Sequence, residues 1–321
     1  VGANKNSIKI IGDNTDMYAQ AYFDYDSKKS GGVTMSHLRF GKSPIKSTYL
    51  IRQANFVACH NPSYVDKYNM VQELVDGGTF LLNCSWDMEG LEEHLPGQVK
   101  SYIANHNIKF YTIDGIKIGK EIGLGGRINT VLQSAFFKLA AIIPEEEAID
   151  LMKAAAKATY GRKGDKIVQM NYDAIDAGAK QVVEIAVPES WKDAADEGLT
   201  TPHVGEGGRA DVVDFVKNIQ AKVNAQEGNT LPVSAFNEYV DGSTPSGSSA
   251  YEKRGIAVDI PIWQPDNCIQ CNRCAYVCPH AVIRPIALTE EEAANAPEGM
   301  DMIDMIGMPN MKFSIAVSAY D

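Results

Sequence analysis

The 321-residue sequence has no run of about 18 apolar residues and nothing that resembles a signal peptide. A membrane-spanning helix is therefore not expected, and the chain is interpreted as cytoplasmic. Positive charge is also scarce, because 30 Lys and Arg face 41 Asp and Glu, which leaves a net charge of −11. General binding of nucleic acid or of an acidic membrane needs a positive field and is excluded as the main function.

Familiar catalytic machinery is missing as well. The sequence contains no Ser/His/Asp triad, no Walker loop and no ordered GxGxxG fingerprint, so no residue is assigned a catalytic role. The sequence opens on Val1 and so lacks an initiator Met, and it closes on Asp321. We interpret it as a segment of a longer polypeptide.

The hydrophobic content of 45% is enough for several buried cores. From Ile8 to about Val187, apolar runs of strand length alternate with stretches of helical period, which is typical of an α/β domain with a largely parallel sheet. The predicted strands are Tyr22–Tyr25, Val33–Phe40, Tyr49–Ile51, Phe56–Ala58, Thr79–Leu82 and Lys109–Ile113. The predicted helices are Ser63–Asp76, Leu91–Asn105, Thr130–Ala141, Glu145–Tyr160 and Asp165–Ala177.

The composition and hydrophobic pattern of the sequence change twice. This predicts three parts, residues 1–190, 191–261 and 262–321. The middle part combines a Gly-rich run at Gly205–Gly208, a helical period over Asp211–Gln226 and a turn-rich stretch at Asp241–Ser249. It is interpreted as a small connector domain, and a flexible spacer remains the alternative for its Ser/Gly stretch.

The last part holds four of the six cysteines within eleven residues: Cys268, Cys271, Cys274 and Cys278. Their gaps of two, two and three residues, followed by proline, are those of a bacterial ferredoxin. In that motif three thiolates bind one [4Fe-4S] cluster and the fourth binds a second cluster. A zinc site or a redox dithiol is the alternative, but zinc sites usually pair two short knuckles far apart.

A methionine-rich stretch, Gly299–Met311, follows the cysteines. Thioether sulfur is a soft ligand for copper, whereas irregularly spaced methionines more often fill gaps in packing. We interpret this stretch as an insertion that covers an edge of the iron–sulfur site.

An anionic ligand of so acidic a chain needs a local basic cluster, and two segments qualify. Gly2–Ser7 is predicted to be a loop that enters a helix, where free backbone N–H groups lie beside Lys5. Asp26–Gly32 follows a predicted strand and offers two cations, two hydroxyls and a glycine pair. Its candidate phosphate ligands are Lys28, Lys29 and Ser30. A solvated lysine turn is the alternative.

Three single residues are weaker candidates. His60 and Asp114 follow predicted strands, where ligands of parallel sheets bind, although a lone residue of this kind is usually structural. Asn129 opens a helix after a glycine-rich stretch and could face a ligand.

With these residues in place, the chain resembles the pyruvate:ferredoxin (flavodoxin) oxidoreductases, a family of large thiamine-dependent enzymes. Val1–Gly12, Tyr25–Gly41 and Gly126–Leu139 look like the gamma-type catalytic domain of that family. Ser249–Ala257 looks like its short domain named for a Glu-Lys-Arg triplet, and the cysteine motif looks like its ferredoxin domain. The segments follow the family's order.

The resemblance implies an α/β gamma-type 2-oxoacid oxidoreductase domain with a largely parallel sheet, then a small connector domain, then a partial bacterial-ferredoxin-like α+β domain. It also implies a reaction in which thiamine diphosphate decarboxylates pyruvate and coenzyme A takes the acetyl group. Electrons would pass through [4Fe-4S] clusters to ferredoxin or flavodoxin. Thiamine diphosphate and Mg²⁺ would belong to flanking domains, because the Gly-Asp-Gly and Asn-Asn thiamine signature is absent here.

The same resemblance implies residue roles and partners. Coenzyme A contacts are expected from Lys28, Lys29, Ser30 and Asn129. Cluster ligands are expected to be Cys268, Cys271 and Cys274 for one cluster and Cys278 for the next. The expected partners are the remaining domains of the enzyme, an electron carrier and a second copy in a homodimer. The segment by itself is not expected to turn over pyruvate.

Two alternatives stay open. A related 2-oxoacid oxidoreductase with another substrate would share the gamma fold, because relatives that act on 2-oxoglutarate and on branched-chain oxoacids have it too. The segment could also be a non-catalytic module for electron transfer or assembly.

Overall fold

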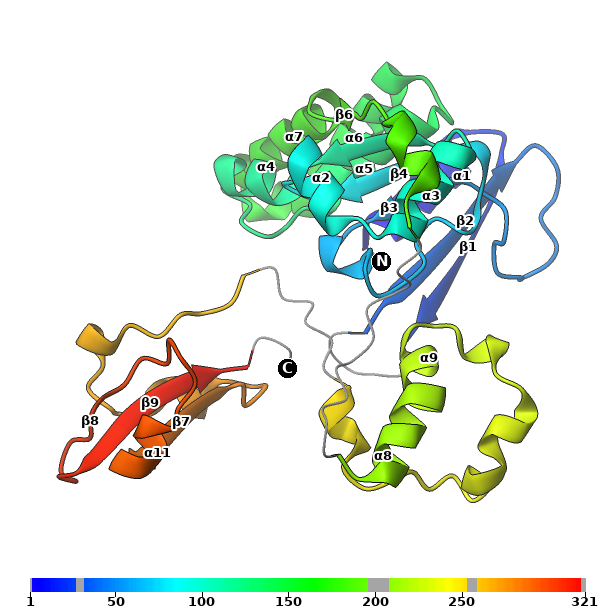
Figure 1. Cartoon of the computed structure of the whole chain (residues 1–321). Helices are drawn as coiled ribbons and strands as arrows, with labels where there is room; N and C mark the ends of the chain where they lie inside the picture. The colour runs from blue at the N-terminus through cyan, green and yellow to red at the C-terminus, as the bar shows by residue number, and fades with distance from the viewer. Residues whose placement is uncertain (1, 27–31, 196–207, 253–258, 319–321) are drawn as a thin grey trace. The chain divides into compact units, whose positions relative to one another are not determined.

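The computed structural model describes residues 2–26, 32–195, 208–252 and 259–318 (Figure 1). It divides into two compact units, Val1–Thr201 with Ala225–Glu227 and Pro202–Asn224 with Gly228–Asp321. Within the described ranges, no helix combines the length and the apolar character that crossing a membrane requires.

The first unit is built on a four-stranded sheet. Its strands β3 (Ala54–Cys59), β4 (Leu74–Asn83) and β5 (Lys109–Ile113) are parallel, and β6 (Val183–Glu184) joins β5 in the antiparallel sense. The order is β3-β4-β5-β6. The predicted α/β fold with a largely parallel sheet is therefore confirmed.

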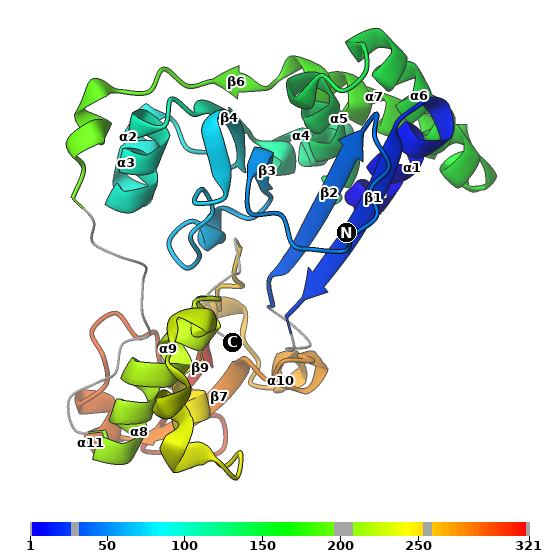
Figure 2. The same cartoon turned by 90° about the vertical axis from the view of Figure 1, so that its right-hand side faces the viewer.

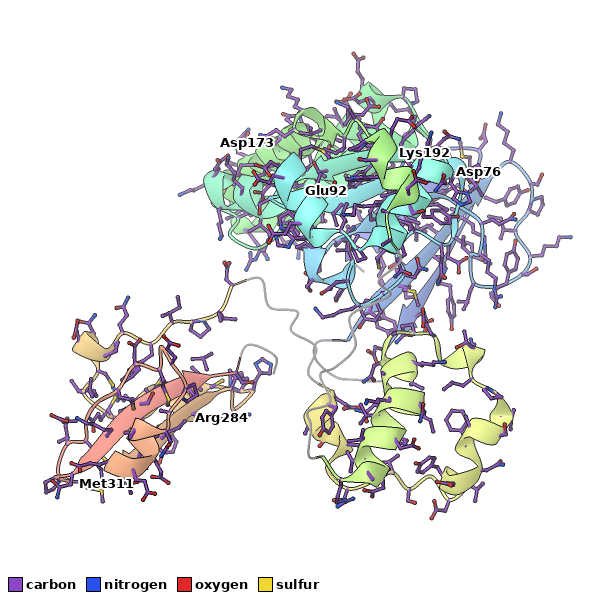
Figure 3. All side chains as sticks on the ribbon, in the orientation of Figure 1. Asp76, Glu92, Asp173, Lys192, Arg284 and Met311 are labelled. Carbon is purple, nitrogen blue, oxygen red and sulfur yellow. The ribbon has the colours of Figure 1, made fainter. Side chains whose placement is uncertain are left out.

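Helices cover both faces of this sheet (Figure 2). On one face Phe80, Leu82 and Phe110 are buried in a cluster with α2 (Met88–His94) and α3 (Gly97–Asn105). Trp191 of the short helix η3 (Glu189–Asp193) belongs to the same cluster, and its indole N–H donates to Glu92 Oε2 at 2.5 Å. The side chains labelled Glu92 and Lys192 in Figure 3 belong to α2 and η3.

On the other face Leu81 and Ile113 pack against α4 (Gly115–Ile122), α5 (Asn129–Ala140) and α7 (Asp165–Lys180). Because neighbouring residues of a strand point to opposite faces, a strand covered on both faces is apolar throughout. This explains the unbroken run Phe80-Leu81-Leu82.

A third cluster joins α5 and α7 to α1 (Gly2–Asn14) and α6 (Glu145–Tyr160) through buried residues such as Ile11 and Phe137. Beside α1 a separate antiparallel hairpin pairs β1 (Tyr18–Tyr25) with β2 (Thr34–Gly41), in a register that joins Tyr25 to Thr34. The two N-terminal predicted strands thus belong to a hairpin and not to the parallel sheet.

Several predicted elements are wrong. Tyr49–Ile51 is not a strand, and Ser63–Asp76 is not a helix: the short helix η1 (Pro62–Tyr64) is followed by turns. Strand β4 already begins at Leu74, inside that predicted helix. The predicted helix Leu91–Asn105 is divided into α2 and α3 at Pro96, because proline has no N–H for a helix interior.

In the second unit, residues 210–224 form one helical stretch, as predicted. It consists of α8 (Ala210–Phe215), a π-helical turn η4 (Val216–Gln220) and α9 (Ala221–Asn224). Its buried side chains, among them Phe215, pack with Leu231, Tyr239 and Tyr251. Further 3-10 helices of the described residues are η2 (Gly161–Lys163), η5 (Gly228–Thr230), η6 (Val233–Tyr239), η7 (Ser248–Tyr251) and η8 (Pro265–Asn267).

The end of the chain forms an antiparallel sheet in the order β7-β9-β8. Its strands are β7 (Ile283–Thr289), β8 (Ile303–Asp304) and β9 (Met311–Val317), and two short helices accompany them, α10 (Arg273–Val277) and α11 (Glu290–Ala294). Phe313 is buried, and its ring meets the indole of Trp263 edge-on at 6.1 Å. This α+β arrangement agrees with a partial ferredoxin-like domain.

Candidate functional site

The cysteine motif lies on a loop around the short helix α10. Cys268 directly follows η8, Cys274 lies within α10, and Cys278 is the C-cap residue of α10. None of the four cysteines of the motif forms a disulfide. Cys271 and Cys274 are exposed, whereas Cys268 and Cys278 are half-buried.

Backbone N–H groups point at two of these sulfur atoms. The chain turns through left-handed conformations at Gln270 and Asn272, with φ of 55° and 57°, and turns of this kind bring N–H groups together on one side. The N–H of Gln270 lies 3.4 Å from Cys268 Sγ. The N–H groups that follow Cys278, that of Val282 above all, lower the pKa of the Cys278 thiol below its usual range.

This donor set fits an iron–sulfur cluster, because the thiolate is the form that binds iron and N–H groups stabilise it. Among the described residues, no three His, Cys, Asp or Glu side chains are arranged to hold a single metal ion. The corners of an iron–sulfur cube hold thiolates farther apart than the ligands of one ion, and a motif shared between two clusters does not bring all four sulfur atoms together.

The first residues of the chain are helical, which corrects the loop predicted over Gly2–Ser7. Helix α1 begins at Gly2 and buries Ala3 and Ser7 in its first two turns, where the Ser7 hydroxyl donates to Ala3 O at 3.0 Å. Gly, Asn and Ser are weak helix formers, so sequence propensity favoured a loop, but burial of this helix face decides the conformation. Lys5 Nζ lies 5.4 Å from the centre of the Phe23 ring on β1.

Helices α1 and α5 start side by side and run in the same direction. A Cβ placed on Gly2 would lie 3.8 Å from Asn129 Nδ2, and one turn later Asn6 Nδ2 donates to Gln133 Oε1 at 3.2 Å. Asn129 is exposed at the first turn of α5. The positive dipole end of α5 thus lies beside α1, the helix that carries Lys5, and a helix N-terminus of this kind favours an anion.

The second predicted anion segment connects the two strands of the hairpin. Strand β1 ends at Tyr25, as predicted, and the N–H of Asp26 donates to Val33 O at 3.1 Å. The loop is therefore at the end of a hairpin and not at the edge of the parallel sheet. Its candidate ligands Lys28, Lys29 and Ser30 lie outside the described residues.

Asp114 follows β5 and has a structural role, whereas His60 follows β3. The Asp114 carboxylate accepts from the N–H of Lys117 at 2.9 Å and caps α4. Burial lowers the pKa of His60 to about 4, so its imidazole is neutral at pH 7. Burial raises the pKa of Cys59 to about 12 and that of Cys84 to about 11, which makes both thiols poor nucleophiles and ligands.

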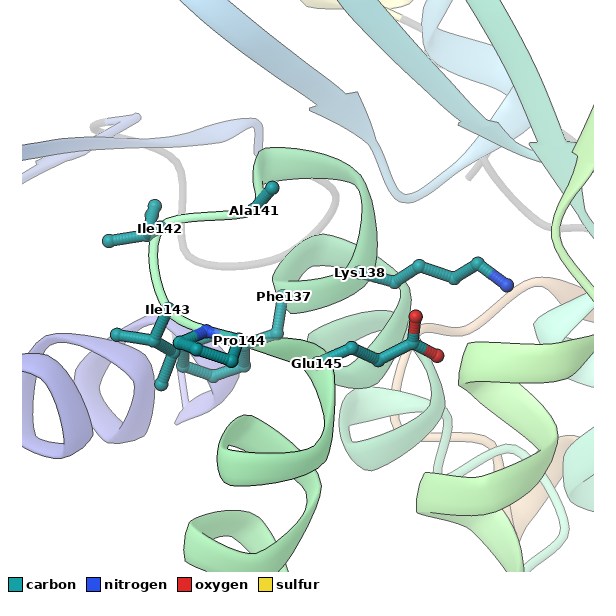
Figure 4. A pocket seen from close by; sticks show the side chains of 7 residues that line it. All are labelled: Phe137, Lys138, Ala141, Ile142, Ile143, Pro144 and Glu145. Carbon is teal, nitrogen blue, oxygen red and sulfur yellow. The ribbon is translucent and has the colours of Figure 1, made fainter.

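Two open depressions in the first unit contain none of the candidate site residues. One, of about 440 Å³, lies where α5 ends and α6 begins, with Lys138 and Glu145 at its rim (Figure 4). The other, of about 280 Å³, lies beside α3, β5 and η3.

Three family models match the chain in succession. Residues 1–181 match pyruvate ferredoxin/flavodoxin oxidoreductase, residues 206–257 match the EKR domain, a domain of unknown function, and residues 260–283 match a 4Fe-4S binding domain. The first match covers more than half of the chain. The chain belongs to the pyruvate ferredoxin/flavodoxin oxidoreductase family.

Curated relatives in this family align with the whole chain. The pyruvate-flavodoxin oxidoreductase of Enterobacter agglomerans is 52% identical over 321 residues, and the pyruvate:ferredoxin oxidoreductase of Moorella thermoacetica is 53% identical over 323. The alignments cover 100% of this chain but 27% of either relative. A pyruvate dehydrogenase [NADP(+)] of Cryptosporidium parvum is 47% identical over 94% of the chain and 16% of its own length. The chain thus spans about a quarter of the length of the first two relatives.

Solved structures show more distant similarity. The pyruvate oxidoreductase subunit PORC of Thermotoga maritima is 16% identical, with a TM-score of 0.45 over 57% of this chain and 89% of its own. A keto/oxoacid ferredoxin oxidoreductase gamma subunit of Geobacter sulfurreducens is 18% identical, with a TM-score of 0.40 over 56% of this chain and 86% of its own.

Proposed function

We propose that this chain is the segment of a thiamine-diphosphate-dependent pyruvate:ferredoxin or flavodoxin oxidoreductase that contacts coenzyme A and relays electrons. The whole enzyme would convert pyruvate and coenzyme A to acetyl-CoA and CO₂. The observation that carries the proposal is a ferredoxin-type cysteine motif with N–H groups directed at its sulfur atoms. It occurs in a chain that aligns over its full length with enzymes of that name.

In this proposal Cys268, Cys271 and Cys274 hold one [4Fe-4S] cluster and Cys278 holds the next. Bound clusters supply one-electron transfer. The role of the protein is to provide thiolates and to orient N–H groups toward them. Strand β9 runs beside these residues, because Val317 pairs with Ile283 and the N–H of Ser318 donates to Val282 O at 3.0 Å. The strand thus ends beside the residues that follow Cys278.

Coenzyme A contacts are proposed for Lys28, Lys29, Ser30 and Asn129. The N-terminus of α5, where Asn129 lies beside α1, supports a phosphate-binding role for this region, since free N–H groups and a positive dipole end attract anions. Two lysines on the hairpin loop would add the charge that a net acidic protein lacks elsewhere. Thiamine diphosphate and Mg²⁺ are assigned to other parts of the enzyme.

The proposal also divides the chain at residues 190 and 261, assigns the enzyme to the cytoplasm as a homodimer, and names ferredoxin or flavodoxin as electron acceptor. It is tested in the full-length enzyme by pyruvate-dependent reduction of a viologen dye with coenzyme A present. Dye reduction that requires both pyruvate and coenzyme A is the expected result. Reduction with 2-oxoglutarate but not pyruvate would change the substrate, and no reduction with any 2-oxoacid would overturn the enzymatic assignment.

The coenzyme A contacts are tested separately with Lys29→Ala. Loss of one charged phosphate contact should weaken coenzyme A binding by about 1–3 kcal/mol, seen as a raised KM for coenzyme A at an unchanged KM for pyruvate. Lys42→Ala is the matched control, because Lys42 follows β2 at the opposite end of the same hairpin. Equal KM values for coenzyme A in both variants would contradict a coenzyme A contact by Lys29 and would favour the solvated lysine turn.

A further inference from the structure

One side chain joins the cysteine loop to the methionine-rich stretch. The Gln270 amide donates from Nε2 to Asp304 O at 2.7 Å and accepts at Oε1 from the N–H of Ile306 at 2.8 Å. The backbone N–H of the same residue points at Cys268 Sγ. Gln270 is therefore linked to the sulfur through its backbone and to the methionine-rich stretch through its side chain.

The Gln270 side chain forms its hydrogen bonds at the outer edge of the small sheet, beside β8. Strand β8 pairs with β9 on one side, where Asp304 stands opposite Lys312 and the N–H of Met305 donates to Met311 O at 3.0 Å. An edge strand leaves alternate backbone groups unpaired on its other side. The Gln270 amide has a donor and an acceptor, as a peptide group does, and it takes the place of a neighbouring strand.

The methionine-rich stretch is anchored from the opposite side as well. Lys312 Nζ lies 2.6 Å from Asp304 Oδ1, and the Ser314 hydroxyl donates to Asp301 O at 2.8 Å. Figure 3 shows Met311, where β9 begins, at the end of this sheet away from Arg284. Residues 301–311 are thus fixed to β9 along one edge and to the cysteine loop along the other.

The backbone of Gln270 gives an independent reason to assign it a specific role. A residue with a Cβ at φ of 55° is in a conformation that glycine and asparagine adopt more readily. Glycine would relieve this conformation, but it has no side chain to bind Asp304 O and Ile306 N–H. The two hydrogen bonds therefore provide a physical reason for glutamine at this position.

We propose that Gln270 is a positioning residue of the iron–sulfur site. Its amide holds residues 301–311 against the loop between Cys268 and Cys271, and this contact fixes the turn that directs an N–H at Cys268 Sγ. The methionine-rich stretch then acts as a cover on this side of the site. The inference rests on the proposed electron relay, because it gives this loop the task of holding a cluster.

The test compares Gln270→Leu with the unchanged full-length enzyme by hydrogen–deuterium exchange and by anaerobic release of iron to a chelator. Leucine removes both hydrogen bonds at nearly the same volume. Exchange of the Ile306 amide should become about three- to tenfold faster, the factor that corresponds to one lost hydrogen bond. Release of iron from the ferredoxin-type site should also become faster.

Two further variants sharpen the comparison. Gln264→Leu is the matched control, since its side chain accepts from Asn267 Nδ2 at 2.9 Å within its own turn, four residues before Cys268. It should leave exchange at Ile306 unchanged. Gln270→Glu keeps the shape and the acceptor for Ile306 N–H but loses the donor to Asp304 O. The exchange rate of its Ile306 amide should lie between the rates in the unchanged enzyme and in Gln270→Leu. This variant therefore still tests the proposal if the leucine variant misfolds.

The outcomes separate the two levels of the proposal. Unchanged exchange at Ile306 in Gln270→Leu, with full iron content, would overturn the positioning role and leave the relay intact. Iron content that stays the same in Cys271→Ala would contradict cluster binding by this motif and so the relay. The exchange comparison would still decide whether Gln270 holds the methionine-rich stretch, because it measures an amide and not a cluster.

Discussion

Gly178 lies in α7 at a close crossing with α5. A Cβ placed on it would lie 2.3 Å from Val131 O and 2.9 Å from Ser134 Cβ, both on α5. The Ser134 hydroxyl donates to Ile175 O at 2.6 Å across the same contact. The two helices therefore approach each other closely because this residue has no side chain.

Gly178→Ala should force the two helices apart. The atom nearest to the new Cβ belongs to the backbone of Val131 and cannot rotate away, so the contact can open only if a helix moves. Overpacking of this kind costs about 1–3 kcal/mol, and the better helix propensity of alanine offsets about 1 kcal/mol. We expect a net loss of up to about 2 kcal/mol, which corresponds to a fall in Tm of up to roughly 8 °C for a unit of this size.

The matched control is Gly161→Ala at the end of α6. Gly161 is exposed, has helical backbone angles of −53° and −36°, and has open space within 4 Å of the point that a Cβ would occupy. Alanine should stabilise this position by about 0.4–1 kcal/mol. Thermal unfolding and hydrogen exchange of α5 and α7 in the full-length enzyme measure both variants. Equal stability of the two would refute the reasoning from the close crossing.

The same substitution should affect the proposed coenzyme A region. Helix α5 begins at Asn129, which lies beside Gly2, so a displaced α5 moves Asn129 relative to α1. We expect Gly178→Ala to raise the KM for coenzyme A more than the KM for pyruvate. A parallel rise in both would indicate general loosening of the enzyme.

Two further predictions concern the ends of the parallel strands. Because burial lowers the pKa of His60 to about 4, the unfolded chain binds a proton between about pH 6.5 and 4 that the folded chain does not. The free energy of unfolding should therefore fall by up to about 3 kcal/mol as the pH drops through this range, and His60→Gln should flatten that part of the curve; an identical slope would contradict the assignment. Asn83 donates to His60 O at 2.9 Å and accepts from the N–H of Gly115 at 2.9 Å. Asn83→Leu leaves both groups unpaired and should cost at least about 2 kcal/mol in denaturant unfolding, whereas Asn105→Leu on the exposed end of α3 should cost less.

Elements with strong local signals were predictable from the sequence. Glu145–Tyr160 is a helix with the bounds predicted, since Pro144 precedes it and three glutamates occupy its first turn. Strand Lys109–Ile113 also agrees in full. The prediction of a helix over Ser63–Asp76 was wrong. Strand β4 begins early, at Leu74, and the apolar residues of this segment are buried in the core beside the sheet without forming a helix face.

The candidate sites divide in the same way. The spacing of the four cysteines is a local property, and the sequence alone therefore predicted an iron–sulfur motif. The role of Gln270 depends on partners 34 and 36 residues away, and no pattern in the sequence indicates that pairing. The contact between Gly2 and Asn129 likewise depends on how two helices pack.

In both candidate sites a local motif offers the chemical groups and a distant element sets their position. The candidate ligands themselves, such as Cys271, Cys274 and Asn129, are exposed, so we expect their substitution to weaken binding at little cost in stability. Gly178 and Gln270 lie outside the binding groups but fix the backbone that carries them, so their substitution should change binding and local stability together. Measuring both quantities in the same variant therefore distinguishes a ligand from a positioning residue.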